Sequence, residues 1–181
     1  MTLSFLKMPK ELNNSKVDLI YKVTDSAIYG FFREHRFLSN YHVCSIIYEG
    51  IEYTSSEAAY QAAHIYYPDS LLRTNIERAR FALMSPVEAK RETHKKSFKD
   101  QIRPDWESIK IEVMYQILMY KFTVHPELKE LLLQTGDKLL EETNYWNDTF
   151  WGVCKGVGEN HLGKVLMKIR NKLKILLPNG N

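Results

Sequence analysis

The segment DWESIKIEVMYQILMYKF, residues 105–122, constrains the fold more strongly than any other part of the chain. Its apolar residues recur at helical spacing and together make a broad stripe. The stripe consists of Ile109, Val113, Met114, Ile117, Leu118 and Phe122. A stripe of this width is typical of a helix that is buried inside a core. We therefore expect residues 106–122 to form a helix at the centre of the fold.

Start and stop signals predict further helices on both sides of this segment. Thr54 and Glu57 have the T-x-x-E spacing of a capping box, which predicts a helix that starts at Thr54 and runs to about residue 66. Ser85 and Glu88 repeat this signal, with a proline in the first turn. The other helices that we expect cover residues 71–84, 85–97 and 126–135, and a last one begins near residue 160.

Short β segments are expected near the N-terminus. Residues 17–23 and 28–32 flank a polar turn and predict two strands. Residues 46–53 have the pattern of a hairpin with Glu49-Gly50 at its turn. A short strand over 138–142 and a long loop over 144–160 follow later in the chain. The sequence therefore predicts a mainly α (α+β) fold, a compact single domain of helices with a small β-hairpin or sheet near the N-terminus.

Composition excludes several classes of protein. No apolar run is long enough to span a membrane and the N-terminus has no signal-peptide core, so we expect no membrane partner. Cys44 and Cys154 are the two thiols of a chain of 181 residues, which favours a reducing, cytoplasmic setting. The six histidines and two cysteines show neither H-E-x-x-H nor C-x-x-C, so we expect no metal site. The net charge of +3 is too small to predict nucleic-acid binding by itself.

The helix expected after Thr54 has two different faces. Glu57, Tyr60, Gln61 and His64 fall at i, i+3, i+4 and i+7 and therefore share one face. Alanines make up the opposite face and allow close packing against a neighbour. A carboxylate beside an amide and a phenol can hold a sugar or orient a water molecule. The alternative is that Glu57 only closes the capping box.

The next predicted helix carries Lys90, Arg91 and His94 along one side, bounded by Val87 and Phe98. Partly buried cations favour an anionic partner such as a phosphate. A desolvated Lys90 that has lost its proton can also attack the C1 atom of a sugar. A solvated basic helix explains the same pattern. Further cations that can contact a nucleic-acid backbone, or be solvated, are Lys95, Lys96, Lys99 and Arg103.

The predicted loop over residues 144–160 joins an acid, Asp148, to the aromatic residues Phe150 and Trp151. A glycine-containing segment after it leads into the last predicted helix, where free backbone N–H groups favour anions. Two glycines before a helix fall short of a phosphate-binding fingerprint. Long loops on rigid scaffolds nevertheless tend to carry function.

Five segments occur in an order that is similar to the NADAR, or YbiA-like, family of N-glycosidases. They are YGFFREHRFLSNY (29–41), YEGIEYTSSEAAYQAAH (48–64), SPVEAKR (85–91), DWESIKIEVMYQILMYKF (105–122) and FWGVCKGVGENHLGKVLMKIR (150–170). The resemblance covers about residues 28–175, which we take as the domain. Residues 1–27 are then an N-terminal arm or extension, and residues 176–181 a C-terminal tail. The resemblance implies a compact, mainly helical fold and hydrolysis of the bond between a ribose C1 atom and a base nitrogen.

The resemblance also implies substrates and site residues. Members of this family act on phosphoribosylamino-pyrimidine intermediates of riboflavin synthesis, and others remove ADP-ribose from guanine. The expected partners are therefore small ribosyl or ADP-ribosyl molecules or ADP-ribosylated DNA, without a cofactor. The implied catalytic residues are Glu57, Asp148 and Lys90. The implied substrate-binding residues are Arg33, Phe37, Ser39, Asn40, Gln61, Trp106, Trp151, Gly152 and Asn160.

Two mechanisms are open for this set of residues. The carboxylates of Glu57 and Asp148 can stabilise the positive charge that builds on the ribose or can activate water. Lys90 can instead form a Schiff base with the ring-opened sugar. Stacking on the base is expected from Phe37, Trp106 and Trp151, and phosphate contact from Arg33. A non-catalytic module that binds ADP-ribose or a nucleotide, and an interaction protein with solvated polar stripes, are the alternatives to an enzyme.

Overall fold

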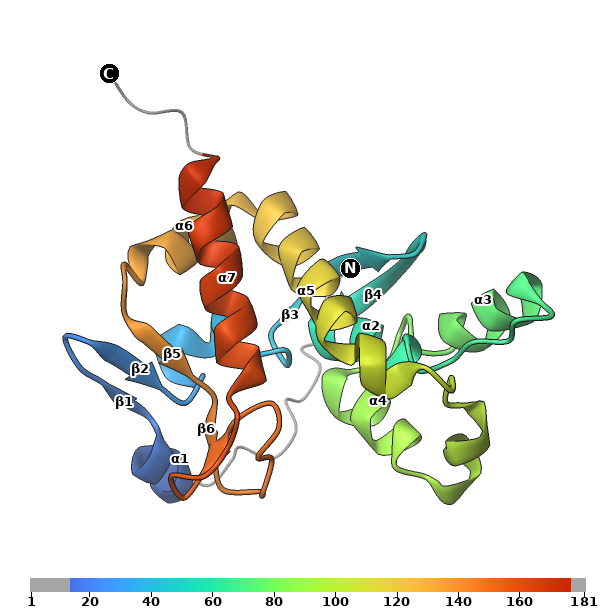
Figure 1. The fold of residues 1–181 in the computed structure, drawn as a ribbon, viewed down its shortest axis with the longest axis horizontal. Helices are drawn as coiled ribbons and strands as arrows, with labels where there is room; N and C mark the ends of the chain where they lie inside the picture. Colours follow the sequence, from blue (N-terminus) through green and yellow to red (C-terminus); the bar gives the residue numbers. More distant parts are fainter. Residues whose placement is uncertain (1–13, 177–181) are drawn as a thin grey trace, which may run out of the picture.

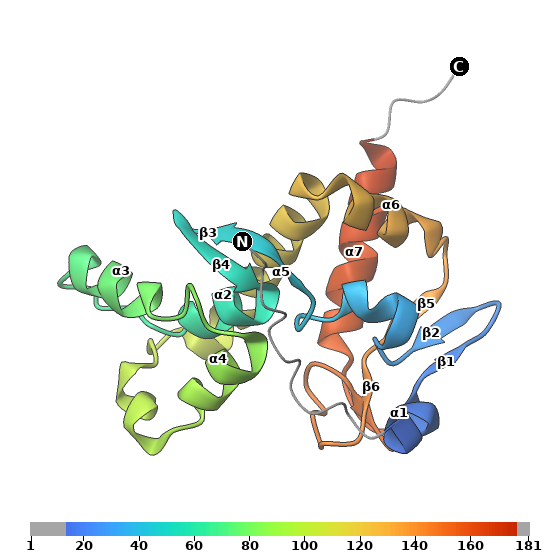
Figure 2. The same cartoon turned by 180° about the vertical axis from the view of Figure 1, so that it is seen from behind.

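A computed structural model describes residues 14–176, and one long helix runs through the middle of it (Figures 1 and 2). This helix, α5, covers Trp106–Val124. It contacts α2 (Ser56–Ala62), α6 (Pro126–Gln134), α7 (His161–Ile175) and strand β3 (Val43–Tyr48). Val113, Ile117 and Phe122 of α5 are at most 4% exposed. The broad apolar stripe therefore predicted the central helix correctly.

The other helices lie around this axis. They are α1 (Asn14–Ile20), α3 (Leu71–Ala79), α4 (Pro86–Thr93) and the 3₁₀ helices η1 (Arg33–Leu38) and η2 (Lys96–Gln101). The expected mainly helical α+β fold is confirmed. Within residues 14–176, no helix combines the length and the apolar content that a membrane crossing requires.

The strands form small separate sheets. Strand β2 (Ala27–Tyr29) pairs antiparallel with β1 (Lys22–Val23) and parallel with β5 (Leu139–Glu141). Strands β3 and β4 (Ile51–Ser55) make the predicted hairpin, and both residues of its turn, Glu49 and Gly50, have positive φ angles of 47° and 80°. Turns of this kind match the twist of paired strands. Strand β6 (Thr143–Asn144) runs parallel to β7 (Val153–Cys154) and so closes the 144–160 loop on itself.

The structure corrects the prediction at the N-terminus. A strand over residues 17–23 is wrong, because α1 is helical up to Ile20 and β1 is only two residues long. Val17 is buried and Asp18 pairs with Arg33, so side chains of α1 are in contact with the rest of the domain. Such tertiary contacts override a local preference for strand. Residues 1–13 of the predicted arm and residues 177–181 of the predicted tail lie outside the described residues.

The start of α2 also differs from the prediction. Ser55 is the N-cap, and its Oγ accepts a hydrogen bond from Ala58 N at 3.1 Å. Thr54 belongs to β4 instead, and its hydroxyl donates to the carbonyl of Met84. The capping box of Ser85 and Glu88 is confirmed. Helices α2, α3 and α4 all end earlier than predicted, at Ala62, Ala79 and Thr93.

The junction between β4 and α2 fixes the position of Glu57. Glu57 N donates to Asn40 O at 3.0 Å, which ties the loop after η1 to the first turn of α2. The same loop is held from the other side by Lys121 of α5, whose Nζ donates to Ser39 O at 3.1 Å. Lys121 is fully buried. Two helices therefore hold the loop that borders Glu57.

Candidate active site

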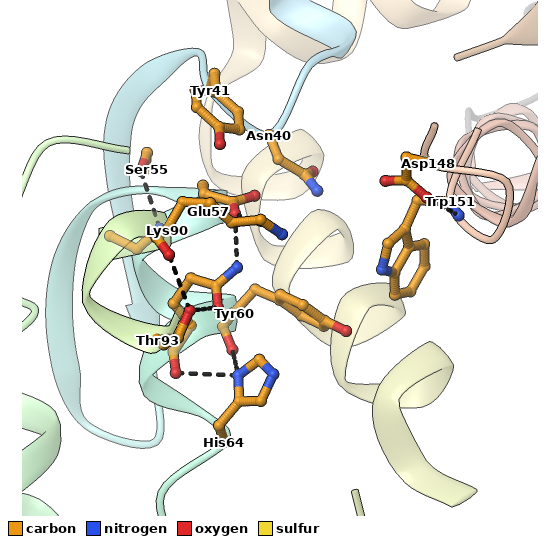
Figure 3. A network of polar contacts seen from close by, with 12 residues as sticks. Asn40, Tyr41, Ser55, Glu57, Tyr60, His64, Lys90, Thr93, Asp148 and Trp151 are labelled. Carbon is orange, nitrogen blue, oxygen red and sulfur yellow. Dashed lines mark hydrogen bonds and ion pairs between the residues drawn. The ribbon is translucent and has the colours of Figure 1, made fainter. Parts of the chain in front are cut away.

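The carboxylate of Glu57 lies in a wall formed by α2 and α4 (Figure 3). Its Oε1 accepts a hydrogen bond from Gln61 Nε2 at 2.6 Å and lies 3.7 Å from Lys90 Nζ. Gln61 Oε1 accepts a hydrogen bond from Thr93 Oγ1 at 2.7 Å. Residues four apart on a helix are neighbours, so Glu57 and Gln61 meet on one face of α2. We refer to Glu57, Gln61, Lys90 and Thr93 as the helical wall.

Burial dominates the electrostatics of Glu57. The side chain of Glu57 is 6% exposed, whereas that of Lys90 is 38% exposed. Burial raises the pKa of Glu57, the charge of Lys90 and the hydrogen bond from Gln61 oppose this rise, and the charge of Asp148 adds to it. A carboxylate that is largely removed from water but still beside a cation can stabilise positive charge that develops on a substrate.

Asp148 faces Glu57 from the other side of an open space (Figure 3). The loop backbone sets its position: Asp148 N donates to Asn144 Oδ1 at 3.2 Å, and Asn144 Nδ2 donates to Asp148 O at 2.7 Å. Asp148 Oδ1 accepts from Trp151 N at 2.9 Å. Side chains of Asn and Asp commonly stabilise loops through such bonds to the backbone. We refer to Asp148 and Trp151 as the loop wall.

Residues of both walls line a cavity of about 330 Å³. Its aromatic lining consists of Tyr60, His64, His94, Trp106, Phe150 and Trp151, and we call it the aromatic cavity. The ring centroids of His64 and Trp106 are 3.8 Å apart, and Trp151 meets Tyr60 edge-on at 5.5 Å. The volume lies in the range of small-molecule sites, and the rings suit a flat heterocycle.

A third carboxylate, that of Glu142 just after β5, lies within electrostatic reach of the other two. Its Oε2 is buried without a hydrogen-bond partner in the part of the chain that the structure describes. Burial raises the pKa of Glu142 to about 8; the charge of Asp148 adds to this rise, Arg36 opposes it, and Glu57 adds to it. Arg36 also lies over the ring of Tyr41, 6.0 Å from its centroid. Burial and then the charge of Glu57 raise the pKa of Tyr41. Glu57, Asp148 and Glu142 thus form an acid cluster beside Arg36 and Tyr41.

Most of the predicted site residues come together in this region. Gln61, Lys90, Trp106 and Trp151 line the aromatic cavity, and Glu57 and Asp148 face each other beside it. Asn40 extends toward the same space in Figure 3. Its Nδ2 donates to Met114 Sδ at 3.4 Å, and its Oδ1 is buried without a partner among residues 14–176. A buried amide oxygen in this state lacks the hydrogen-bond donor that such groups normally have.

Three other predicted residues hold the frame of the site. Ser39 Oγ accepts a hydrogen bond from Tyr41 N at 3.1 Å. Asn160 Oδ1 accepts from Glu142 N at 3.1 Å, and its Nδ2 donates to a carbonyl of β5 at 2.9 Å. Gly152 lies so close to Glu142 that a β-carbon on it would overlap the Glu142 carbonyl oxygen. These contacts place the acid cluster by fixing the backbone around it.

Arg33 and Phe37 lie elsewhere. Arg33 pairs with Asp18 and its side chain is 51% exposed. Phe37 is 5% exposed within the core, with its ring near that of His35. The lining of the aromatic cavity, as far as the structure describes it, includes neither residue.

The candidate residues derived from the sequence did not include Arg36, Glu142, Lys110 or Lys121. A signal existed for Lys110, which follows Trp106 by four residues on α5 and also lines the cavity. No comparable signal existed for Glu142, because it joins the acid cluster only through strand pairings of two or three residues. No group of three His, Cys, Asp or Glu side chains among the described residues is arranged to hold a metal ion.

Comparison with known proteins identifies relatives of the whole fold. A family model described as the NADAR domain matches residues 21–174. An N-glycosidase of Nostoc punctiforme is 44% identical over 78 residues, which cover 42% of this chain and 49% of that protein. A riboflavin biosynthesis protein of Vibrio vulnificus is 37% identical over 141 residues, which cover 77% of this chain and 36% of that protein. The chain thus spans about half, or less, of the length of these two relatives.

The Escherichia coli protein YbiA is similar over a larger share of its length. Under the name N-glycosidase YbiA, it is 37% identical over 139 residues, which cover 76% of this chain and 81% of that protein. Its NMR structure matches with a TM-score of 0.72 and 29% identity, covering 92% of this chain and 95% of that chain. The two proteins therefore share the arrangement of helices and small sheets described above.

Proposed function

The chain belongs to the NADAR domain family, and from this premise we propose that it is an N-glycosidase that hydrolyses the bond between a ribose C1 atom and a nitrogen of a heterocycle. The names of its relatives in Nostoc and Escherichia coli support this reaction. The observation that carries the proposal is the buried carboxylate of Glu57, which faces Asp148 beside a cavity lined with aromatic rings.

The reaction requires two kinds of assistance. When the C1–N bond breaks, positive charge builds on the ribose ring, and a buried carboxylate stabilises that charge more strongly than water does. We assign this role to Glu57, which Gln61 and Lys90 hold in place. The oxygen of a water molecule then bonds to C1 as the C1–N bond breaks, and Asp148 takes one proton from this water and passes it to the departing nitrogen, which regenerates the carboxylate.

The position of Lys90 favours direct hydrolysis over a Schiff base. Its Nζ lies 3.7 Å from Glu57 Oε1 and forms an ion pair with it, so this nitrogen is engaged by the proposed catalytic carboxylate instead of being placed to attack C1. We therefore expect no covalent adduct when the protein is incubated with substrate and borohydride. Trapping of an adduct on Lys90 would contradict direct hydrolysis.

The aromatic cavity is the proposed site for the heterocycle. Trp106, Tyr60 and Trp151 present ring faces and edges there, and stacking on flat bases is a common use of such rings. Two substrate classes fit this arrangement: a phosphoribosylamino-pyrimidine of riboflavin synthesis, in agreement with the name of the Vibrio relative, and ADP-ribosylated guanine. Both place a ribose C1 atom next to a heterocycle.

The test is incubation of the protein with each substrate in turn, followed by mass spectrometry of the products. We expect release of the free heterocycle together with ribose phosphate or ADP-ribose from at least one substrate, and loss of release in Glu57→Gln. Glu159→Gln is the matched control, since it makes the same change at a carboxylate that is 62% exposed. Absence of release from both substrates with the unaltered protein would contradict the proposed function.

A further inference from the structure

His64 follows the C-terminal end of α2 and uses one ring nitrogen to cap that helix. Its Nδ1 lies 3.2 Å from Tyr60 O and 3.1 Å from Gln61 O. Both oxygens are carbonyls of the last helical turn, where backbone acceptors lack their usual partners. A carbonyl oxygen only accepts hydrogen bonds, so Nδ1 must carry the proton and donate it. The contacts therefore select the tautomer with hydrogen on Nδ1.

The second ring nitrogen, Nε2, is left as an acceptor facing the cavity. His64 is part of the cavity lining, and Figure 3 shows this nitrogen on the side of the ring away from the capped carbonyls. In the described part of the chain, Nε2 takes part in no hydrogen bond. The ring of Trp106 lies 3.8 Å away, centroid to centroid, and fixes the plane of the imidazole.

The environment also keeps this ring neutral. Burial lowers the pKa of His64 to about 4, and the two hydrogen bonds to Gln61 and Tyr60 oppose this effect without reversing it. The charge of Lys90 lowers the pKa further, while that of Glu107 raises it. A neutral imidazole with hydrogen on Nδ1 presents a lone pair at Nε2.

We propose that His64 is a specificity-determining residue whose Nε2 accepts a hydrogen bond from an N–H group of the substrate's heterocycle. This proposal rests on the proposed function, which places the heterocycle in the aromatic cavity. Lys90 and Lys110 also line that cavity, but they can only donate. The carboxylate of Glu107 already accepts a hydrogen bond from Lys110 at 2.6 Å. A heterocycle that lacks an N–H group would leave the Nε2 acceptor unpaired, which lowers affinity.

The first test is the tautomer of His64, measured by NMR on protein labelled with ¹⁵N in its histidine rings at pH 7. The signals of His64 are those that disappear in His64→Asn. We expect a protonated Nδ1 and an unprotonated Nε2 in the free protein, and a change of the Nε2 signal when guanosine 5′-monophosphate is added. A proton on Nε2 in the free protein would overturn the proposal.

The second test compares the binding of two nucleotides by titration calorimetry. Guanosine 5′-monophosphate carries N–H groups on its base, whereas purine riboside 5′-monophosphate has the same sugar and phosphate but no N–H group on its base. We expect the unaltered protein to bind the guanine nucleotide more tightly by about 10- to 100-fold, the range for one unpaired buried polar group. Equal affinities, or binding of neither nucleotide, would overturn the proposal.

Two variants of His64 separate recognition from folding. His64→Phe keeps a flat ring beside Trp106, and His64→Asn keeps a donor for the helix carbonyls, but neither places an acceptor at the position of Nε2. We expect the preference for the guanine nucleotide to fall to about 1 in both. His161→Phe is the control, since His161 packs on Phe150 of the same cavity at 4.4 Å but its Nε2 is bonded to Glu159. It should retain the preference.

These measurements do not depend on hydrolysis, so the two proposals can fail separately. A protein that shows the preference but releases no heterocycle from any substrate contradicts the proposed function alone. A protein that hydrolyses its substrate but shows no preference, or keeps it in both His64 variants, contradicts the role of His64 alone.

Discussion

The helical wall and the loop wall face each other across one cavity but are held in different ways. In the helical wall, side chains bind side chains: Gln61 donates to Glu57 and accepts from Thr93, across two helices. In the loop wall, side chains bind the backbone: Asp148 accepts from Trp151 N, and Asn144 holds Asp148. A substitution in the helical wall therefore changes charge on a fixed scaffold. A substitution in the loop wall moves the scaffold itself.

The largest effect on activity is expected from substitution of the two proposed catalytic acids, Glu57 and Asp148. Glu57→Gln keeps the shape of the side chain and removes its charge, so we expect kcat to fall by about 10²- to 10⁴-fold, the usual contribution of such a group. The free energy of unfolding should not fall, because an uncharged amide is less costly to bury than a carboxylate. Steady-state kinetics and urea denaturation measure the two quantities.

Substitutions of Asp148 show whether the loop wall contributes charge, backbone order or both. Asp148→Asn retains an oxygen that can accept from Trp151 N, whereas Asp148→Ala removes that hydrogen bond as well. We expect both variants to lose activity, but only Asp148→Ala to lose stability, by about 1 kcal/mol. Equal stability of the two variants would contradict the view that Asp148 orders the loop.

The second largest effect is expected at Gly152, which carries no reactive group. A β-carbon at this position would overlap the carbonyl of Glu142, and this carbonyl is held because it accepts from Val153 N at 2.9 Å. Gly152→Ala should therefore destabilise the protein by about 3 kcal/mol, the upper part of the range for overpacking. Urea denaturation followed by circular dichroism measures this change.

Gly136→Ala is the control for backbone strain without overlap. Gly136 has a φ angle of 63°, and a β-carbon there would meet no atom within 4 Å among the described residues. A left-handed alanine costs about 1 kcal/mol. If both variants lose the same stability, steric contact with Glu142 is not what makes Gly152 necessary.

A smaller effect, with a distinct pH profile, is expected from Glu142. Its pKa rises from 4.5 to about 8 on folding, so between these values the folded protein binds more protons than the unfolded chain. The stability contributed by the protonated carboxyl group is therefore complete below pH 4.5 and is lost as the pH rises through 8. Glu142→Gln cannot titrate, so its stability relative to the unaltered protein should be lowest below pH 4.5 and should rise until the pH passes 8. A difference that does not change with pH would contradict this assignment.

The helical wall was the more predictable half of the site. A period of 3.6 residues placed Glu57 and Gln61 on one face, and the Ser85 capping box located the helix that brings in Lys90. The cap at Thr54 was wrong by one residue, because β4 extends to Ser55 and takes Thr54 into the hairpin. Local patterns identify such elements because most of the interactions that define them lie within a few residues.

The loop wall and the acid cluster were less predictable. Asp148 and Trp151 stood out by composition, but their orientation depends on hydrogen bonds to Asn144 and on the approach of Gly152 to Glu142. Those contacts join residues whose spacing in the sequence follows neither the helical nor the strand period. Glu142 was missed for the same reason, since only the packed structure brings its charge close to that of Asp148.

The smallest effect is expected where the sequence and the structure disagree about a cation. Arg33 was the predicted phosphate contact, but it is half exposed and pairs with Asp18 of α1. Arg33→Ala should change stability by less than about 0.5 kcal/mol, because exposed ion pairs contribute little, and should leave KM unchanged.

Arg36→Ala is the informative counterpart. Arg36 opposes the raised pKa of Glu142, so its removal should shift the pH at which Glu142 loses its proton to a higher value. A raised KM in Arg33→Ala, with no change in the pH at which Glu142 loses its proton in Arg36→Ala, would indicate that Arg33 and not Arg36 is the cation that acts at the site.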